Sequence, residues 1–129
     1  MATIKSYTDY SQAQILSKIL PDESADMSWA SNGLGKPFAR TIPIKGYPEE
    51  LCGCWSLAAL LSVLPLHLIV NNQRYAFSMI KGLDKNGETY AIKYAIFNTT
   101  FYFHLTDAYD NPVDACYEMI LKLNELNLL

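Results

Sequence analysis

The sequence predicts an α+β fold in two layers, in which a small antiparallel β-meander of three to four strands packs mainly one face against about three helices. Two observations predict this class. Three consecutive segments between residues 74 and 106 alternate apolar and polar side chains with the period of a strand. Segments with apolar residues at helical spacing precede and follow them. The chain has 129 residues, half of them hydrophobic, which predicts a single domain over residues 1–129.

Two segments before the meander carry helical signals. Residues 8–20 predict a helix capped by Thr8 or Asp9, with its apolar residues on one face. Residues 47–64 predict a second helix, because Pro48 suits a first helical position and the middle of the segment is apolar nearly all round. A proline follows each segment and closes it.

The segment between these two helices predicts a loop and a short strand. In residues 22–37 the apolar side chains follow neither the helical period nor the strand period, and Ser, Gly, Asn and Asp are frequent. We therefore expect a long loop with Met27 and Trp29 as apolar anchors. Residues 38–44 predict a short strand, which a proline restricts to an edge or an end.

The meander begins with a short strand at residues 67–70 and continues through a hairpin whose turn contains Gly87. A tight turn around Asn98 leads to the last strand. One side of that strand is expected to carry Phe101, Phe103 and Leu105, and the other Tyr102, His104 and Thr106. The apolar face of this sheet would then pack against the helices.

The last helix has the clearest signals. Asn111 is the expected cap, Pro112 takes the first helical position, and Asp114 complements the helix dipole. The expected apolar stripe consists of Val113, Cys116, Tyr117, Ile120 and Leu123.

Composition excludes several classes of partner. The net charge is −3, and no stretch rich in Lys or Arg offers a footprint for phosphates, so nucleic acid is not expected. The longest apolar run, residues 57–70, is interrupted by Pro65 and His67 and is too short to span a bilayer. The first residues lack the apolar core of a secretory signal. Three cysteines, an odd number, fit reduced thiols, and we expect a cytoplasmic protein.

The stretch "CGCW" at residues 52–55 raises the question of a catalytic thiol, since it is one residue short of the C-G-S-C-W motif of papain-like proteases. Short hydrolases of this kind place a cysteine on a helix and a histidine on a later strand. Cys54 and His104 have that order, with Asp107 or Asn111 to orient the imidazole. The competing interpretation is a buried cysteine on an apolar helix, the usual environment of a free cysteine.

Other ligand sites are weaker. The C-x-C pair of Cys52 and Cys54 lacks the second cluster of a structural zinc site, so we expect no metal. The stretch "SNGLGKP" lacks the spacing of a phosphate-binding loop, and no cofactor is expected. A small-ligand domain with an apolar pocket between helices and sheet stays open as an alternative.

Three blocks together carry a resemblance: "IKSYTDYSQAQILSKILPDESADM", "CWSLAALLSVLP" and "NPVDACYEMILKLNELNLL". They resemble, in this order, a group of short proteins from gut anaerobes of the Bacteroides type and from their phages or integrated elements. The resemblance brings no activity, cofactor or catalytic residue. It implies a small cytoplasmic protein of mobile-element origin.

The leading hypothesis is a non-enzymatic protein–protein interaction module, an accessory protein of a phage or mobile element. Low charge, nine tyrosines and an exposed sheet edge favour a protein partner or pairing with a second copy as a homodimer. The residues expected to bind are Met27 and Trp29 in the long loop, and Lys93, Tyr102 and His104 on the outer sheet face. The rival hypotheses are the small cysteine hydrolase and the ligand-binding domain.

Overall fold

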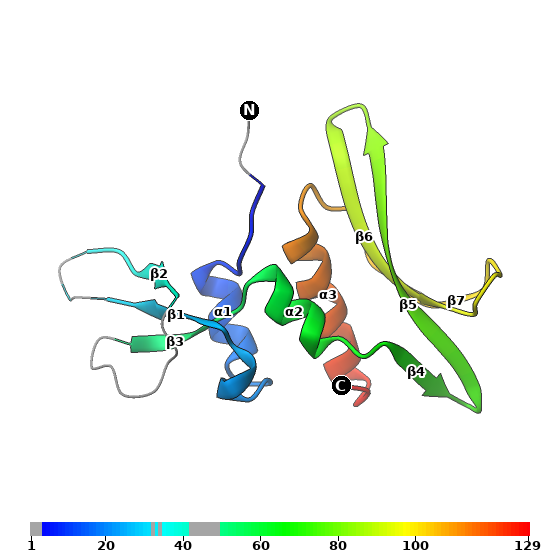
Figure 1. Ribbon diagram of the computed structural model, residues 1–129, viewed down its shortest axis with the longest axis horizontal. Coiled ribbons are helices and arrows are strands. Elements are labelled where there is room, and N and C mark those ends of the chain that lie inside the picture. The colour runs from blue at the N-terminus through cyan, green and yellow to red at the C-terminus, as the bar shows by residue number, and fades with distance from the viewer. Residues whose placement is uncertain (1–3, 32, 34, 42–49) are drawn as a thin grey trace. The chain divides into compact units, whose positions relative to one another are not determined.

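The computed structural model describes residues 4–31, 33, 35–41 and 50–129, and it confirms the α+β class. Within these residues the chain forms three α-helices, a short 3₁₀ turn (Asp22–Ser24) and two antiparallel sheets (Figure 1). It divides into two compact units, Ser6–Ser62 and a second unit formed by Met1–Lys5 with Val63–Leu129. None of the helices in the described ranges is long and apolar enough to cross a membrane.

The unit Ser6–Ser62 contains a three-stranded sheet of order β2-β1-β3. Its elements are α1 (Tyr10–Leu16), β1 (Met27–Ala30), β2 (Phe38–Arg40), β3 (Glu50–Cys54) and most of α2 (Leu57–Val63). The sequence did not predict this sheet. Its strands are only three to five residues long, too short for an alternating pattern to stand out.

Helix α1 begins where the sequence predicts. The Asp9 carboxylate accepts a hydrogen bond from the Gln12 backbone N–H at 2.8 Å, and the Gln12 side chain accepts one from the Asp9 N–H at 3.1 Å. This reciprocal pair satisfies two donors that the first helical turn leaves open. The buried residues Ala13 and Leu16 lie on the side of the helix that packs against β3.

The predicted helix over residues 47–64 is wrong in its first half. Residues 50–54 form β3, which pairs with β1, and α2 begins only at Leu57. Pairing with a distant segment therefore overrides the local helical pattern. Gly53 is the signal that argued against a helix here, because glycine in a helix interior costs about 1 kcal/mol. Pro48 lies outside the described residues.

The predicted loop over residues 22–37 is also partly wrong, since Met27–Ala30 form the central strand of this sheet. Two contacts fix the segment before β1. The Trp55 indole N–H donates to Ser24 Oγ at 2.9 Å, and the Asp26 carboxylate accepts from the backbone N–H and hydroxyl of Ser56. Both contacts join residues about thirty positions apart, which local patterns cannot reveal. The predicted strand over 38–44 is confirmed at Phe38–Arg40; residues 42–44 lie outside the described ranges.

The second unit contains the predicted meander, a four-stranded antiparallel sheet of order β4-β5-β6-β7. Its strands are β4 (His67–Val70), β5 (Gln73–Asp84), β6 (Gly87–Ala95) and β7 (Tyr102–Leu105). Residues with positive φ make the turns between strands: Asn71, Asn72, Gly87 and Asn98. Asn and Gly tolerate this left-handed backbone better than other residues, which explains why the turns fall where they do.

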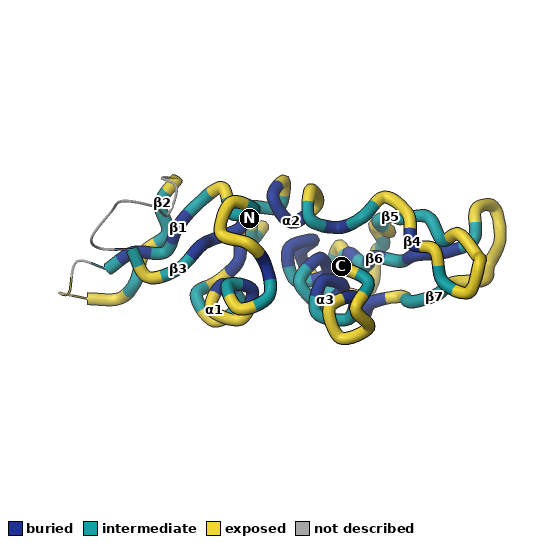
Figure 2. Tube along the Cα trace, turned by 90° about the horizontal axis from the view of Figure 1, so that it is seen from below, coloured by how far each residue is buried: buried dark blue, intermediate teal, exposed yellow. Residues whose placement is uncertain are grey.

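Helix α3 (Pro112–Glu125) packs against β6 and supplies about half of the buried apolar residues of this unit. Figure 2 shows the buried segments gathered along α3 and β6. As predicted, Asn111 is its cap and accepts a hydrogen bond from the Asp114 N–H at 2.8 Å. Lys5 forms an ion pair with Asp114 at 2.9 Å and so attaches the N-terminal segment to the start of α3.

The two faces of the meander differ from the prediction. Tyr94 pairs directly with His104, so both lie on the face that α3 covers, whereas Lys93 pairs with Leu105 on the opposite face. Lys93 and His104 therefore do not share one face. A register shift between Tyr94 and Ala95 places Tyr102 opposite Ala95, on the face of Lys93. A bulge of this kind reverses the alternation that the sequence suggests.

The cap of α3 yields a stability prediction. We expect Asn111→Ala to lower the free energy of unfolding by about 1–2 kcal/mol. The change removes the acceptor that caps the Asp114 N–H, and it removes the two hydrogen bonds that the buried side-chain amide, 5% exposed, donates to the carboxylates of Asp110 and Asp114. Urea denaturation followed by circular dichroism measures the change. Asn124→Ala, at an exposed position of the same helix, is the matched control and should change it by less than about 0.5 kcal/mol.

The same variant tests the single-domain prediction. Both tryptophans, Trp29 and Trp55, belong to Ser6–Ser62, whereas Asn111 belongs to the other unit. If residues 1–129 unfold as one domain, Asn111→Ala should shift the tryptophan fluorescence transition as much as the circular dichroism transition. An unshifted fluorescence transition would show that the units unfold separately.

Candidate functional site

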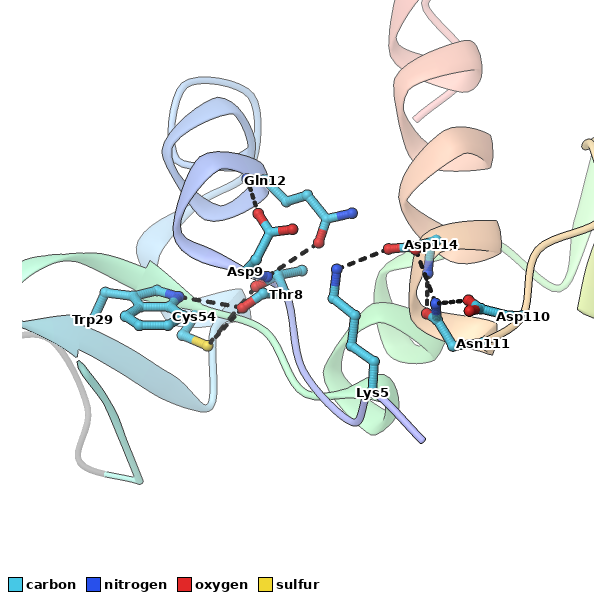
Figure 3. A network of polar contacts seen from close by, with 9 residues as sticks. All are labelled: Lys5, Thr8, Asp9, Gln12, Trp29, Cys54, Asp110, Asn111 and Asp114. Carbon is cyan, nitrogen blue, oxygen red and sulfur yellow. Dashed lines mark hydrogen bonds and ion pairs between the residues drawn. The ribbon is translucent and has the colours of Figure 1, made fainter. Parts of the chain in front are cut away.

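Cys54 lies at the end of β3 and not on a helix, and its side chain is wholly buried. Its Sγ donates to the Thr8 carbonyl at 3.6 Å and accepts from the Thr8 hydroxyl at 3.8 Å (Figure 3). Burial raises the pKa of the Cys54 thiol to about 11, and the Asp26 carboxylate contributes in the same direction. A nucleophilic cysteine requires the opposite shift. This thiol is protonated at neutral pH and forms part of the core.

The hydrolase hypothesis also needs a histidine. The unit of Cys54 contains none, because both histidines of the chain, His67 and His104, belong to the other unit. The other cysteines offer no better nucleophile. Burial raises the pKa of Cys52, and it raises the pKa of Cys116 on α3 to about 12.

Trp29 is an anchor inside its unit. Its indole N–H donates to the Thr8 carbonyl at 3.2 Å, and its ring contacts Tyr7 and Tyr10 edge to face, with centroids 6.2 and 5.8 Å away. Met27 lies on the same sheet face, opposite Cys54. Both residues are half-buried and present less surface than the sequence suggested, and Trp29 joins β1 to the segment around α1.

The uncovered face of the meander offers a larger surface. We call it the outward face and define it by Ile69, Arg74, Ile80, Lys93 and Tyr102. The exposed fractions are 66% for Ile69, 38% for Ile80 and 58% for Tyr102. Two predicted binding residues, Lys93 and Tyr102, belong to it. Its ionised side chains are basic, and from Arg74 to Gly82 in β5 and from Thr89 to Ala95 in β6 no carboxylate points to this face.

His104 and Asp107 meet elsewhere, in a pocket of about 370 Å³ between β7 and α3. We call it the β7–α3 groove. Its lining residues are His104, Leu105, Asp107, Glu118, Leu121, Lys122 and Glu125. The sequence gives no signal for the four residues on α3, because only the apolar stripe of this helix forms a periodic pattern. Their spacing of three and four positions places them on one face of the helix.

Glu118 is held firmly in this groove. Its carboxylate accepts from the Tyr109 hydroxyl at 2.7 Å and from the Asp107 backbone N–H at 3.1 Å. The hydrogen bond to Glu118 raises the pKa of Tyr109 to about 12, with burial as a second cause. These contacts fix the segment after β7 against α3. They also keep one negative charge at a defined place in the groove.

No group of three His, Cys, Asp or Glu side chains suited to a metal ion occurs in the described part of the chain. Searches against protein families, curated proteins and solved structures found no match for this sequence.

The thiols provide a direct test of the hydrolase hypothesis. With a pKa of about 11, roughly one Cys54 in a thousand is ionised at pH 8, and the side chain is buried. We expect iodoacetamide to modify half-buried Cys52 first, and Cys54 and Cys116 only after unfolding. Peptide mass spectrometry of samples labelled between pH 5.5 and 9 measures each rate. Rapid labelling of Cys54 below pH 7 would contradict the core assignment.

Proposed function

We propose that this protein is a non-enzymatic protein-binding module that docks a partner on the outward face of the meander. The observation that carries the proposal is the composition of this face. It combines exposed apolar side chains with basic charges, Arg74 and Lys93, although the chain as a whole has a net charge of −3. Apolar, aromatic and arginine side chains are the types enriched at protein interfaces.

The charges on this face favour a partner other than a second copy in a symmetric arrangement. Two outward faces packed on each other would bring like charges from Arg74 and Lys93 together, which opposes association. The fitting partner is a protein surface with an apolar centre bordered by carboxylates. Such a partner would bury Ile69, Ile80 and Tyr102 and pair with the two cations.

Further inferences accompany this proposal. Three free cysteines favour residence in the reducing cytoplasm. The resemblance to short proteins of Bacteroides-type anaerobes, their phages and integrated elements favours an accessory role in a mobile element. An adaptor that binds one partner protein fits both inferences without requiring any chemistry of its own.

The test uses a photo-reactive benzoyl-phenylalanine at position 102 in the full-length protein, expressed in its native cells. We expect position 102 to give one abundant cross-linked partner, which is then purified and measured for binding. Position 83 is the control, since Leu83 is 81% exposed but lies near the hairpin turn on the other face. Equal cross-linking from both positions would contradict docking on the outward face.

Charge-reversal variants measure how much the basic residues of the outward face contribute to the affinity for the partner. Lys93→Glu should weaken binding of the purified partner at least about tenfold, because it places like charges in contact. Lys85→Glu, the same change in the exposed hairpin turn, should leave the affinity within about twofold. A partner that binds both variants as tightly as the unmodified protein does not use this face. Concentration-dependent self-association that Lys93→Glu alters would instead assign the face to a homodimer and contradict the heterologous partner.

A further inference from the structure

The β7–α3 groove lies beside the free edge of the meander. In the sheet order β4-β5-β6-β7, β7 is the last strand, and no described residue pairs with its outer edge. One side of the groove is lined by helix α3, and the other by β7 and the residue after Thr106. The lining residues are Glu118, Leu121, Lys122 and Glu125 on the helix, and His104, Leu105 and Asp107 opposite. An edge strand next to a helix can accept an added strand from another chain.

The backbone of β7 is oriented for such an addition. The Thr106 N–H donates to the Ile92 carbonyl at 2.9 Å, and the Ile92 N–H donates to the Thr106 hydroxyl at 2.9 Å, so Thr106 directs its N–H towards β6. Because hydrogen-bonded and non-hydrogen-bonded pairs alternate in antiparallel strands, the N–H and C=O of Leu105 point away from β6. Leu105 also lines the groove and is 39% exposed. It therefore offers a backbone donor and acceptor at the groove.

The side chains of the groove define the chemistry of its occupant. Three carboxylates, those of Asp107, Glu118 and Glu125, face one ammonium group, that of Lys122, which lies 3.8 Å from Glu125. Leu121 gives the same pocket an apolar side, while Leu105, whose side chain lies on the outward face with Lys93, borders it with its backbone. Lysine and arginine combine an apolar stem with a cationic end, so they match this combination of groups.

We propose that the β7–α3 groove binds an extended peptide segment of a partner protein as an added strand on β7, with an arginine or lysine side chain in the pocket. The added strand pairs with the backbone of Leu105. Its basic side chain packs its stem on Leu121 and reaches the carboxylates of Asp107 and Glu125. This site is separate from the outward face and binds the opposite charge, so either site can fail without the other.

The test is a titration of the ¹⁵N-labelled full-length protein with the synthetic peptide Ac-Thr-Val-Arg-Val-Thr-NH₂, followed by NMR amide shifts. We expect the shifts to concentrate at residues 103–107 and 118–125. A peptide with glutamate in place of arginine tests the charge. A peptide N-methylated at the two valines, or alternatively at the threonines and arginine, removes the donors on one edge at a time. One of these two should lose binding at least about tenfold.

Substitutions in the protein test whether the carboxylates of the groove bind the arginine of the peptide. Asp107→Asn with Glu125→Gln should weaken the arginine peptide about tenfold or more, whereas Glu23→Gln with Asp84→Asn, the same charge change at exposed positions, should not. Equal binding of the arginine and glutamate peptides, undiminished binding of both N-methylated peptides, or no shift at millimolar peptide would each overturn the proposal. Because none of these changes touches Arg74, Lys93 or Tyr102, the outcome leaves the test of the outward face unaffected.

Discussion

The packing of α3 on β6 is the interaction on which the candidate surfaces depend. It buries Ile92 and Tyr94 of the strand against Cys116 and Ile120 of the helix, all of them fully inaccessible. Tyr94 adds a hydrogen bond from its hydroxyl to the Pro65 carbonyl at 2.5 Å, which ties the start of β4 to the sheet. Covering one face of the meander leaves the other face outward. It also places the polar side of α3 next to the edge strand β7.

In the other unit a buried hydroxyl has a comparable role. Thr8, which is fully inaccessible, donates its N–H to the Trp55 carbonyl and accepts the Trp55 N–H at its Oγ1. The same residue contacts the Cys54 thiol and accepts the Trp29 indole N–H. The conspicuous residues Cys54 and Trp29 are therefore used to join α1 to the sheet. The thiol of Cys54 and the indole N–H of Trp29 both form contacts with Thr8 inside the unit, as Figure 3 shows.

Local signals predicted the elements whose causes are local. Asn111 followed by Pro112 predicted the start of α3 because a cap and a preset φ act within one turn. Gly87 and Asn98 marked turns for the same kind of reason. The errors arose where distant contacts decide: β3 needs β1 as its partner, and the segment before β1 needs Ser56 and Trp55.

In the candidate sites, too, local patterns predicted some features, while contacts between distant segments decide the others. Lys93 could be placed on the outward face from alternation alone. Direct pairing with Tyr94 puts His104 on the other face, and only the register shift near Ala95 brings Tyr102 to the face of Lys93. The groove joins residues 104–107 with residues 118–125, and its acidic character emerges only when the helix lies beside the strand. A surface formed by two elements cannot be predicted from the periodicity of either one.

The free edge of β7 could pair unselectively with strands of other chains, as open strand edges do. Three features limit it here. The strand has only four residues, a register shift interrupts its ladder, and three carboxylates stand beside it. A second copy approaching edge to edge would bring its own carboxylates against these, which opposes pairing of β7 with itself. A strand that carries a basic residue meets attraction in place of this repulsion. The charges that protect the edge from self-association thus select the kind of segment that can use it.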